Sequence, residues 1–523
     1  MRIKYNYLWI LIAWLITMAM IGPWGEFCIN DDWAYAKGVE NLNNGTWEYS
    51  NWQGMPFFAQ QVWGLVWVKI FGFSFTVLRF SGIFMGALGL YFLIKSLRLL
   101  TTFENAFWMT CIIACNPLYI HLSASFMTDI PCLTMSLGGF LYLMRFKLSG
   151  RTKYLWPALF FLLAGTLIRQ FALIVPIAFI IGAGWKIKTN FIKIIFYTIL
   201  TGVLLYLLSL HNSLTESYQG ALPKNYGFQF NTIKKLWLDF TNLPFQKIGY
   251  YGYNALIFLG LGIAPMTLRH FKFWPWRKSL AFGLLIFVGV LKIMLTDNYW
   301  PFTADIIYPV GLGSIFLDGF HSSSNPTNTV FVAVIGISLM VISCYSLANL
   351  IGRIERAGSK LRVELVTIVL ISILPLVVLY ISDRYMIFAV TFAVMAVARV
   401  YHLKVNKWLF GAMALVTTLL CINQFNFQKS KAALIEFAEG DGGNSKTING
   451  GFEYNAWHNF DMNNYDPEEL NWWWVEDDRY VVKLTNNKVG YEVLKEESYV
   501  NWMTFQKKKV YLLKRTEDGA LNK

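Results

Sequence analysis

Apolar stretches of membrane-spanning length recur along most of this 523-residue chain. Hydrophobic residues make up 56% of the sequence and charged residues only 15%, and the mean hydropathy is +0.43. A helix of about 20 apolar residues crosses the hydrocarbon core of a bilayer, and these stretches repeatedly approach that length. The sequence therefore predicts an α-helical polytopic membrane protein.

We expect about thirteen transmembrane helices, and we expect the stretch 306–317 to be re-entrant or interfacial, because it is short and contains Pro309, Gly311 and Gly313. Basic residues concentrate in the short loops that are cytoplasmic when the N-terminus lies inside, which fixes this orientation. The long loops 25–77, 211–250 and 297–328 then face away from the cytoplasm. The expected spans are residues 7–24, 78–97, 104–120, 130–147, 154–167, 170–185, 191–210, 251–268, 279–296, 329–350, 361–382, 385–401 and 407–426.

The composition changes near residue 428, where the long apolar stretches end and acidic residues become frequent. Alternating runs at 479–485 and 509–514 predict strands, and paired glycines mark turns. We therefore expect a transmembrane domain at residues 1–427 and a small soluble α+β domain, outside the cytoplasm, at residues 428–523. The net charge of +14 follows from the loop charges of a membrane protein and gives no reason to expect nucleic acid as a partner.

Three aspartates lie just beyond predicted spans. Asp31 and Asp32 follow the first span, and Asp129 follows the third in the run Ser-Phe-Met-Thr-Asp-Ile-Pro. Sugar transfer from a polyprenyl phosphate requires a base that faces away from the departing phosphate, and a carboxylate at the membrane surface suits that role. We predict all three as catalytic candidates, and because Asp31 and Asp32 are adjacent, at most one of them can point fully into the site. The alternative is that these side chains only cap helices, at Asn30-Asp31-Asp32 and before Pro131.

A lipid phosphate that leaves as an anion requires fixed positive partners. An arginine at the centre of a membrane helix costs roughly 2.5 to 3.5 kcal/mol, so a cation kept near that depth indicates a partner. The cations predicted near the outer surface are Arg79, Arg169, Lys292 and Arg384. Phosphate contact is favoured for Arg169 and Arg384, whereas Lys292 is better explained by snorkelling to the headgroups.

Several other residue types have structural explanations. The six cysteines are interpreted as small core residues. Aromatic residues crowd the outer loops as an interfacial belt, with some available to stack on sugar rings. The run Trp472-Trp473-Trp474 could bind sugar or pack the tail against the membrane. No metal site is predicted, although the first-loop carboxylates leave a divalent cation open as a cofactor.

Several short motifs together resemble a known family. They are the acidic pair followed by Tyr35, Asp129 before a proline, the run Thr166-Leu-Ile-Arg169, and Arg384-Tyr385 at the start of a late span. With the topology, they resemble the protein O-mannosyltransferase-like glycosyltransferases of family 39, which include the lipid A aminoarabinose transferase. The resemblance covers roughly residues 1–427 and implies a C-type membrane glycosyltransferase fold.

The resemblance implies transfer of a hexose or pentose from a polyprenyl-phosphate carrier on the extracytoplasmic face of a membrane. It assigns Asp31 as the base, Asp129 as the second-loop acid, and Arg169 and Arg384 as contacts of the lipid phosphate. Tyr35, Arg79 and Tyr385 complete the expected substrate-binding set. Asp32 stands where the protein O-mannosyltransferases have glutamate, and loop 211–250 holds no inserted sugar-binding domain. A bacterial inner-membrane enzyme is therefore expected, and among a glycan, a lipid or a protein as acceptor, these departures favour a cell-surface glycan or lipid over a protein.

Two other classes share these general features. A transporter or flippase of lipid-linked glycans is also polytopic, but it is expected to carry ionisable residues near the bilayer midplane or to show repeated halves. A glycan polymerase or ligase uses similar lipid-linked substrates with a different donor. Because the carboxylates here gather in the outer loops, the sequence favours the glycosyltransferase.

Overall fold

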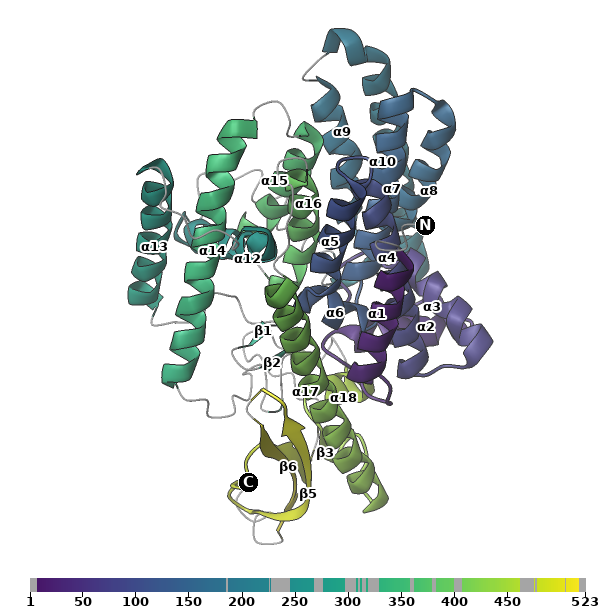
Figure 1. Cartoon of the computed structure of the whole chain (residues 1–523). Coiled ribbons are helices and arrows are strands. Elements are labelled where there is room, and N and C mark those ends of the chain that lie inside the picture. The colour runs from purple at the N-terminus through teal and green to yellow at the C-terminus, as the bar shows by residue number, and fades with distance from the viewer. Residues whose placement is uncertain are drawn as a thin grey trace.

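The computed structural model describes the chain mainly as helices, with a small sheet near the C-terminus (Figure 1). The described residues are 7–184, 187–224, 226, 245–267, 276–296, 307–308, 311–312, 317, 329–357, 362–378, 382–398, 407–460, 475, 477–503 and 505–516. The run Trp472-Trp473-Trp474 lies outside them.

The first half of the chain forms the helices that carry Asp31, Asp129 and Arg169 or lie next to them. Figure 1 shows them gathered on one side of the molecule, with α7 among α4, α8 and α10. In chain order they are α1 (Tyr7–Ile21), α2 (Asp32–Asn43), α3 (Phe58–Phe71), α4 (Phe75–Leu97), α5 (Phe103–Ala114), α6 (Pro117–Ser123), α7 (Asp129–Ser149), η2 (Thr152–Tyr154), α8 (Leu155–Thr166), η3 (Gln170–Leu173), α9 (Ile174–Gly184) and α10 (Ile187–Gln219).

The second half adds a further group of helices and the C-terminal sheet. Its elements are α12 (Phe245–Thr267), α13 (Trp276–Thr296), β1 (Ile307–Tyr308), β2 (Gly311–Leu312), α14 (Thr329–Ala357), α15 (Val363–Val378), η6 (Asp383–Tyr385), α16 (Met386–Val397), α17 (Lys407–Gly440), β3 (Ile448–Asn449), α18 (Phe452–Asn459), β4 (Tyr480–Lys483), β5 (Tyr491–Asn501) and β6 (Gln506–Arg515).

Helix starts in the first half follow local capping chemistry. Ser74 accepts a hydrogen bond from the Val77 amide at the start of α4, and Asn116 accepts one from the Leu118 amide at the start of α6. Pro117 occupies the first position of α6, where a missing amide proton is tolerated. This Asn-Pro pair breaks the predicted span 104–120 into α5 and α6, which are bent by 65° relative to each other.

Four helices within the described residues are long and apolar enough to cross a membrane, or five if the bent pair α5 and α6 counts as one span. The four segments are Phe75–Leu97, Asn190–Gln219, Ala333–Leu350 and Phe410–Gly440. The predicted total of thirteen spans stays a prediction.

The C-terminal sheet has the strand order β3-β4-β6-β5. Strand β3 is parallel to β4, the other two pairs are antiparallel, and the β5–β6 pair has an irregularity between Val493 and Lys495. Strands β4 and β6 confirm the two strands that the alternating runs predict. The sheet packs on the C-terminal half of α17 around Leu434, Tyr480 and Leu512.

Helix α17 passes without a break through residue 428, where the sequence places the domain boundary. The membrane helices and the tail are therefore joined by one continuous helix. Leu317, at the end of the stretch expected to be re-entrant, is buried in the same core as the tail sheet. Within that stretch the described residues form the short antiparallel pair β1 and β2.

Candidate functional site

Asp31 lies between α1 and α2, at the position that would cap α2. Its side chain makes no capping hydrogen bond. Instead, Arg384 Nη1 donates to Oδ2 at 2.7 Å, and the indole Nε1 of Trp52 donates to Oδ1 at 3.0 Å. Because both carboxylate oxygens are engaged by distant residues, capping does not explain this aspartate.

Asp129 is the first residue of α7 and is likewise held by an arginine. Arg169 Nη1 lies 2.5 Å from Asp129 Oδ1 and 3.3 Å from the Thr128 hydroxyl, and both charged side chains are mostly buried. Thr128 makes no side-chain cap to α7, and its hydroxyl lies 2.9 Å from the sulfur of Met55 in the first loop. These contacts fix the second-loop acid against the first loop.

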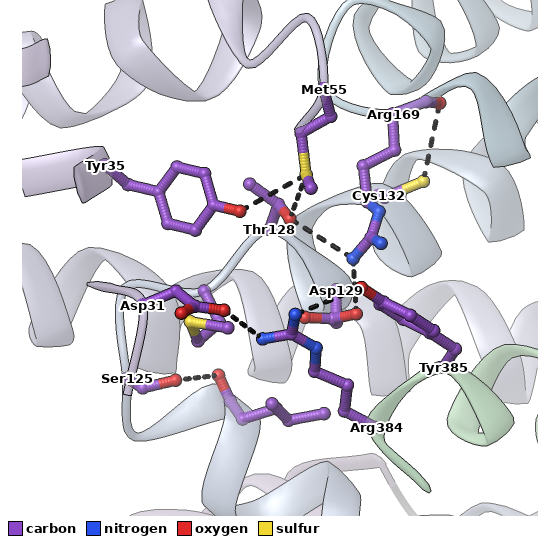
Figure 2. Close-up of polar contacts among 12 residues, drawn as sticks. Asp31, Tyr35, Met55, Ser125, Thr128, Asp129, Cys132, Arg169, Arg384 and Tyr385 are labelled. Carbon is purple, nitrogen blue, oxygen red and sulfur yellow. Dashed lines mark hydrogen bonds and ion pairs between the residues drawn. The ribbon is translucent and has the colours of Figure 1, made fainter. Parts of the chain in front are cut away.

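Tyr385 joins the two ion pairs. The guanidinium carbon of Arg169 lies 4.6 Å from the centre of the Tyr385 ring, and that of Arg384 lies 5.0 Å from it. Arg384 Nη2 also donates to the Tyr385 hydroxyl at 3.0 Å. Figure 2 shows the guanidinium of Arg384 between Asp31 and Asp129, with Arg169 and Tyr385 beside Asp129. The ring face attracts both cations and holds them next to each other despite their like charge.

A pocket opens beside this group. Asp129, Arg169, Arg384 and Tyr385 form its polar side, and the rest of its wall is Cys132, Phe171, Ile387 and Phe388. Asp31 is outside the lining but is joined to it through Arg384. A charged end against an apolar wall matches the chemistry of a lipid phosphate.

Tyr35 lies next to this group. Its hydroxyl is 3.5 Å from the Met55 sulfur, and burial raises the pKa of its phenol. Tyr35 and Thr128 therefore meet at the same methionine (Figure 2). The predicted substrate-binding residues Tyr35, Arg169, Arg384 and Tyr385 are thus in one region of the molecule.

Asp32 and Arg79 are not brought into the pocket. Asp32 is fully buried, accepts a hydrogen bond from the Ile29 amide at 2.6 Å, and has its pKa raised to about 7 by burial, against the opposing charge of Arg79. Arg79 donates to the carbonyls of Gly25, at 2.8 Å, and Phe27. Both residues hold the turn that follows α1, whereas Asp31 alone of the acidic pair turns to the arginines.

Lys292 does not extend its charged end to the surface of the molecule, as snorkelling would require. Its side chain is buried, and Nζ donates to Asn254 Oδ1 at 2.7 Å and lies 4.6 Å from the centre of the Tyr250 ring. These partners come from α12, so the expected snorkelling of Lys292 is wrong. It does not line the pocket that contains Arg169 and Arg384.

Sequence reasoning missed the roles of Trp52, Met55 and Phe388. Trp52 was one of many aromatic residues of the first loop, and nothing in its local sequence distinguishes it from the others. Phe388 lies in a predicted span, where the sequence does not distinguish a residue that lines a pocket from an ordinary core residue. Only the position of Phe388 shortly after Arg384-Tyr385 could have suggested it.

The donor set does not favour a divalent cation. Asp31 is paired with Arg384, and Asp129 is paired with Arg169. The positive charge of the arginine would repel a metal cation bound at either acid. Among the residues that the structure describes, no three His, Cys, Asp or Glu side chains form a metal-binding group.

Comparison with known proteins gives one family match. No curated protein sequence matches the chain. Two solved structures of ArnT from Cupriavidus metallidurans are similar to this chain. The apo state has 11% identity and a TM-score of 0.38, and the match covers 84% of this chain and 80% of that one. The state bound to undecaprenyl phosphate has 12% identity and a TM-score of 0.36, and the match covers 83% of this chain and 79% of that one. Residues 59–211, which include Asp129 and Arg169, match the family described as dolichyl-phosphate-mannose-protein mannosyltransferase. This match confirms the predicted resemblance over residues 59–211, the part of the chain that holds the Asp129 and Arg169 motifs.

Proposed function

We propose that this chain is an integral membrane glycosyltransferase that moves a sugar from a polyprenyl-phosphate carrier to an extracytoplasmic acceptor, with Asp31 as the general base. The matched family acts, by its description, on dolichyl-phosphate mannose, which supports a lipid-phosphate donor. The acceptor is a cell-surface glycan, a lipid or a protein. The proposed setting is a bacterial inner membrane, with the site and the C-terminal domain at residues 428–523 on the outer face.

One observation carries the proposal. Acids from two separate loops, Asp31 and Asp129, are each paired with an arginine, and both arginines lie against the ring of Tyr385. A purely structural role would be served by a single ion pair between one acid and one cation. Two pairs sharing an aromatic ring, beside a pocket with an apolar wall, form a site where an anion can replace the carboxylates as partner of both arginines.

The proposed chemistry follows from that exchange. The phosphate of the donor pairs with Arg384 and Arg169, which releases Asp31 from its ion pair. The acceptor hydroxyl then attacks C1 of the sugar while Asp31 takes the hydroxyl proton. The bond between C1 and the phosphate oxygen breaks, the electron pair stays on the phosphate, and the two arginines stabilise the added charge. Asp129 is left to orient the sugar or the acceptor.

The test uses purified full-length protein in nanodiscs with a panel of polyprenyl-phosphate sugars. Transfer of label from one donor to an acceptor, followed by mass spectrometry, supports the proposal and identifies the sugar. Mass spectrometry of surface glycans and lipids from cells with and without the gene identifies the acceptor. Movement of an intact lipid-linked glycan between leaflets without bond cleavage contradicts the proposal and favours a flippase.

A further inference from the structure

Four aromatic rings connect the C-terminal segment to the first outer loop. Phe452 and Phe460, at the two ends of α18, lie against Trp52, with ring centres 6.1 and 6.0 Å from it. The same two phenylalanines lie 6.3 and 5.0 Å from the ring of Trp33 in α2. Trp33 and Trp52 are themselves 6.3 Å apart. We call Trp33, Trp52, Phe452 and Phe460 the aromatic cluster.

Trp52 is the member of this cluster that touches the candidate base. Its indole N–H donates to Oδ1 of Asp31 at 3.0 Å, while Arg384 holds Oδ2. An indole has only one donor, so the direction of the ring decides whether that bond forms. The ring direction is set in turn by the residues packed on its faces and edges, which include Phe452 and Phe460.

Helix α18 is held firmly on its other side. Glu453, in its first turn, pairs with Lys431 of α17 at 2.9 Å, and both side chains are 3% exposed. Gln428 of α17 also donates to Glu453, at 3.4 Å. The apolar segment Phe410–Gly440 makes up most of α17, so this buried ion pair ties α18 to a helix that is long and apolar enough to cross a membrane. Ion-paired on one side and packed on rings on the other, α18 has little freedom to shift relative to Trp52.

We propose that α18 of the C-terminal segment is a positioning element of the active site: Phe452 and Phe460 orient Trp52, and Trp52 aims the carboxylate of Asp31. Trp52, Phe452 and Phe460 are positioning residues. This inference rests on the proposed function, because it assigns the tail a part in the same reaction. It also gives a reason why the catalytic helices and the tail share the unbroken helix α17.

The matched control comes from the same helix. Trp457 of α18 packs on Phe73 and Phe75, with ring centres 6.1 and 5.0 Å away, and has Lys37 over its ring. It thus anchors α18 to the first half of the chain as Phe452 does, but without touching Trp52. A loss that comes only from loosening α18 would appear equally in Trp457→Leu.

The experiment measures kcat and KM for the lipid-linked donor in nanodiscs, with melting temperature recorded for each variant. Trp52→Phe keeps an aromatic ring, although a smaller one, and removes the donor; it is expected to lower kcat about tenfold with KM within about twofold. Phe452→Ala with Phe460→Ala is expected to lower kcat in the same way, and Phe452→Leu to restore most of it. Trp457→Leu is expected to keep wild-type kcat. Wild-type kcat in Trp52→Phe, or an equal loss in Trp457→Leu, overturns the inference.

A second measurement does not depend on turnover. A carbodiimide with a small amine labels accessible carboxyl groups, and mass spectrometry reports the rate at Asp31. Faster labelling in Trp52→Phe and in the double phenylalanine variant than in Trp457→Leu supports the inference, and equal rates overturn it. Retained activity in Asp31→Asn would overturn the proposed base, whereas an inactive Asp31→Asn with unchanged Trp52→Phe would overturn only the role of α18.

Discussion

Asp31 and Arg384 are 353 positions apart in the sequence and are joined by an ion pair of 2.7 Å. The pair connects the loop after α1 to the turn η6 before α16. Both side chains are mostly buried, and removing one partner of such a pair leaves a charge without compensation. The same arginine is offered to the phosphate in our proposal, so its substitution affects both the resting structure and the donor.

Substitution of the arginines tests the phosphate contact. Arg384→Lys and Arg169→Lys keep the charge but lose the planar fork that can hold two oxygens and lie on Tyr385. Each is expected to raise KM for the donor about tenfold to a hundredfold, since hydrogen bonds to charged groups contribute about 1.5 to 3 kcal/mol. The measurement is steady-state transfer over a range of donor concentrations.

Arg98 supplies the control for those variants. It lies at the end of α4, with its guanidinium carbon 4.8 Å from the centre of the Phe103 ring, and it is absent from the pocket lining. Arg98→Lys removes an arginine on an aromatic ring without touching the site and is expected to leave KM unchanged. If Arg384→Lys also leaves KM unchanged, the donor phosphate does not bind at Arg384.

The two contacts of Tyr385 can be separated. Tyr385→Phe removes the hydroxyl that accepts from Arg384 but retains the ring under both guanidinium groups. Tyr385→Leu removes both. Because a partly buried cation–π contact contributes about 0.5 to 2 kcal/mol, we expect kcat/KM to fall only a fewfold in the phenylalanine variant and about tenfold or more in the leucine variant. Equal losses in both variants would mean that the hydroxyl, not the ring, holds the arginines.

Asp32 predicts a pH dependence of stability. Burial raises its pKa in the folded protein to about 7, far above that of an exposed aspartate, so the folded state favours the protonated acid. The stability linked to Asp32 is present in acid and is lost as the pH rises from about 4 through 7. Asp32→Asn stays neutral and can still accept from the Ile29 amide. We therefore expect its melting temperature to exceed that of the wild type increasingly between pH 5 and about 8. If the melting temperatures of the two proteins change with pH in the same way, the ionisation of Asp32 does not destabilise the fold.

The residues of the candidate site could be predicted from the sequence better than the structure around them, because their residue types carry the chemistry. Acids beyond a span and arginines at outer loop ends were visible as residue types, and the structure brings Asp31, Asp129, Arg169 and Arg384 together. The break between α5 and α6 also had a signal, Asn116-Pro117, which cap and proline preferences could have revealed. The hydropathy continues through this pair and by itself favours a single span.

Other features had no local signal. Which member of the Asp31-Asp32 pair turns to the arginines depends on the backbone of the turn at Asn30, where φ is +55°. The link from α18 to Trp52 joins residues 400 or more positions apart, and aromatic residues are too frequent in this chain for any one to stand out. The predicted domain boundary at residue 428 depends on a change in composition. The helix α17 nevertheless continues through this position.

The most direct measurement compares donor binding and turnover in Asp31→Asn, with Asp129→Asn beside it. The amide cannot accept the acceptor's proton but keeps the size of the side chain. Loss of general base catalysis typically costs 10²- to 10⁴-fold, so we expect turnover of Asp31→Asn to fall by at least about a hundredfold. Binding of the lipid-linked donor should stay the same or tighten, because Arg384 loses its competing carboxylate. Turnover of Asp31→Asn within a fewfold of the wild type would contradict the assignment of Asp31 as the base.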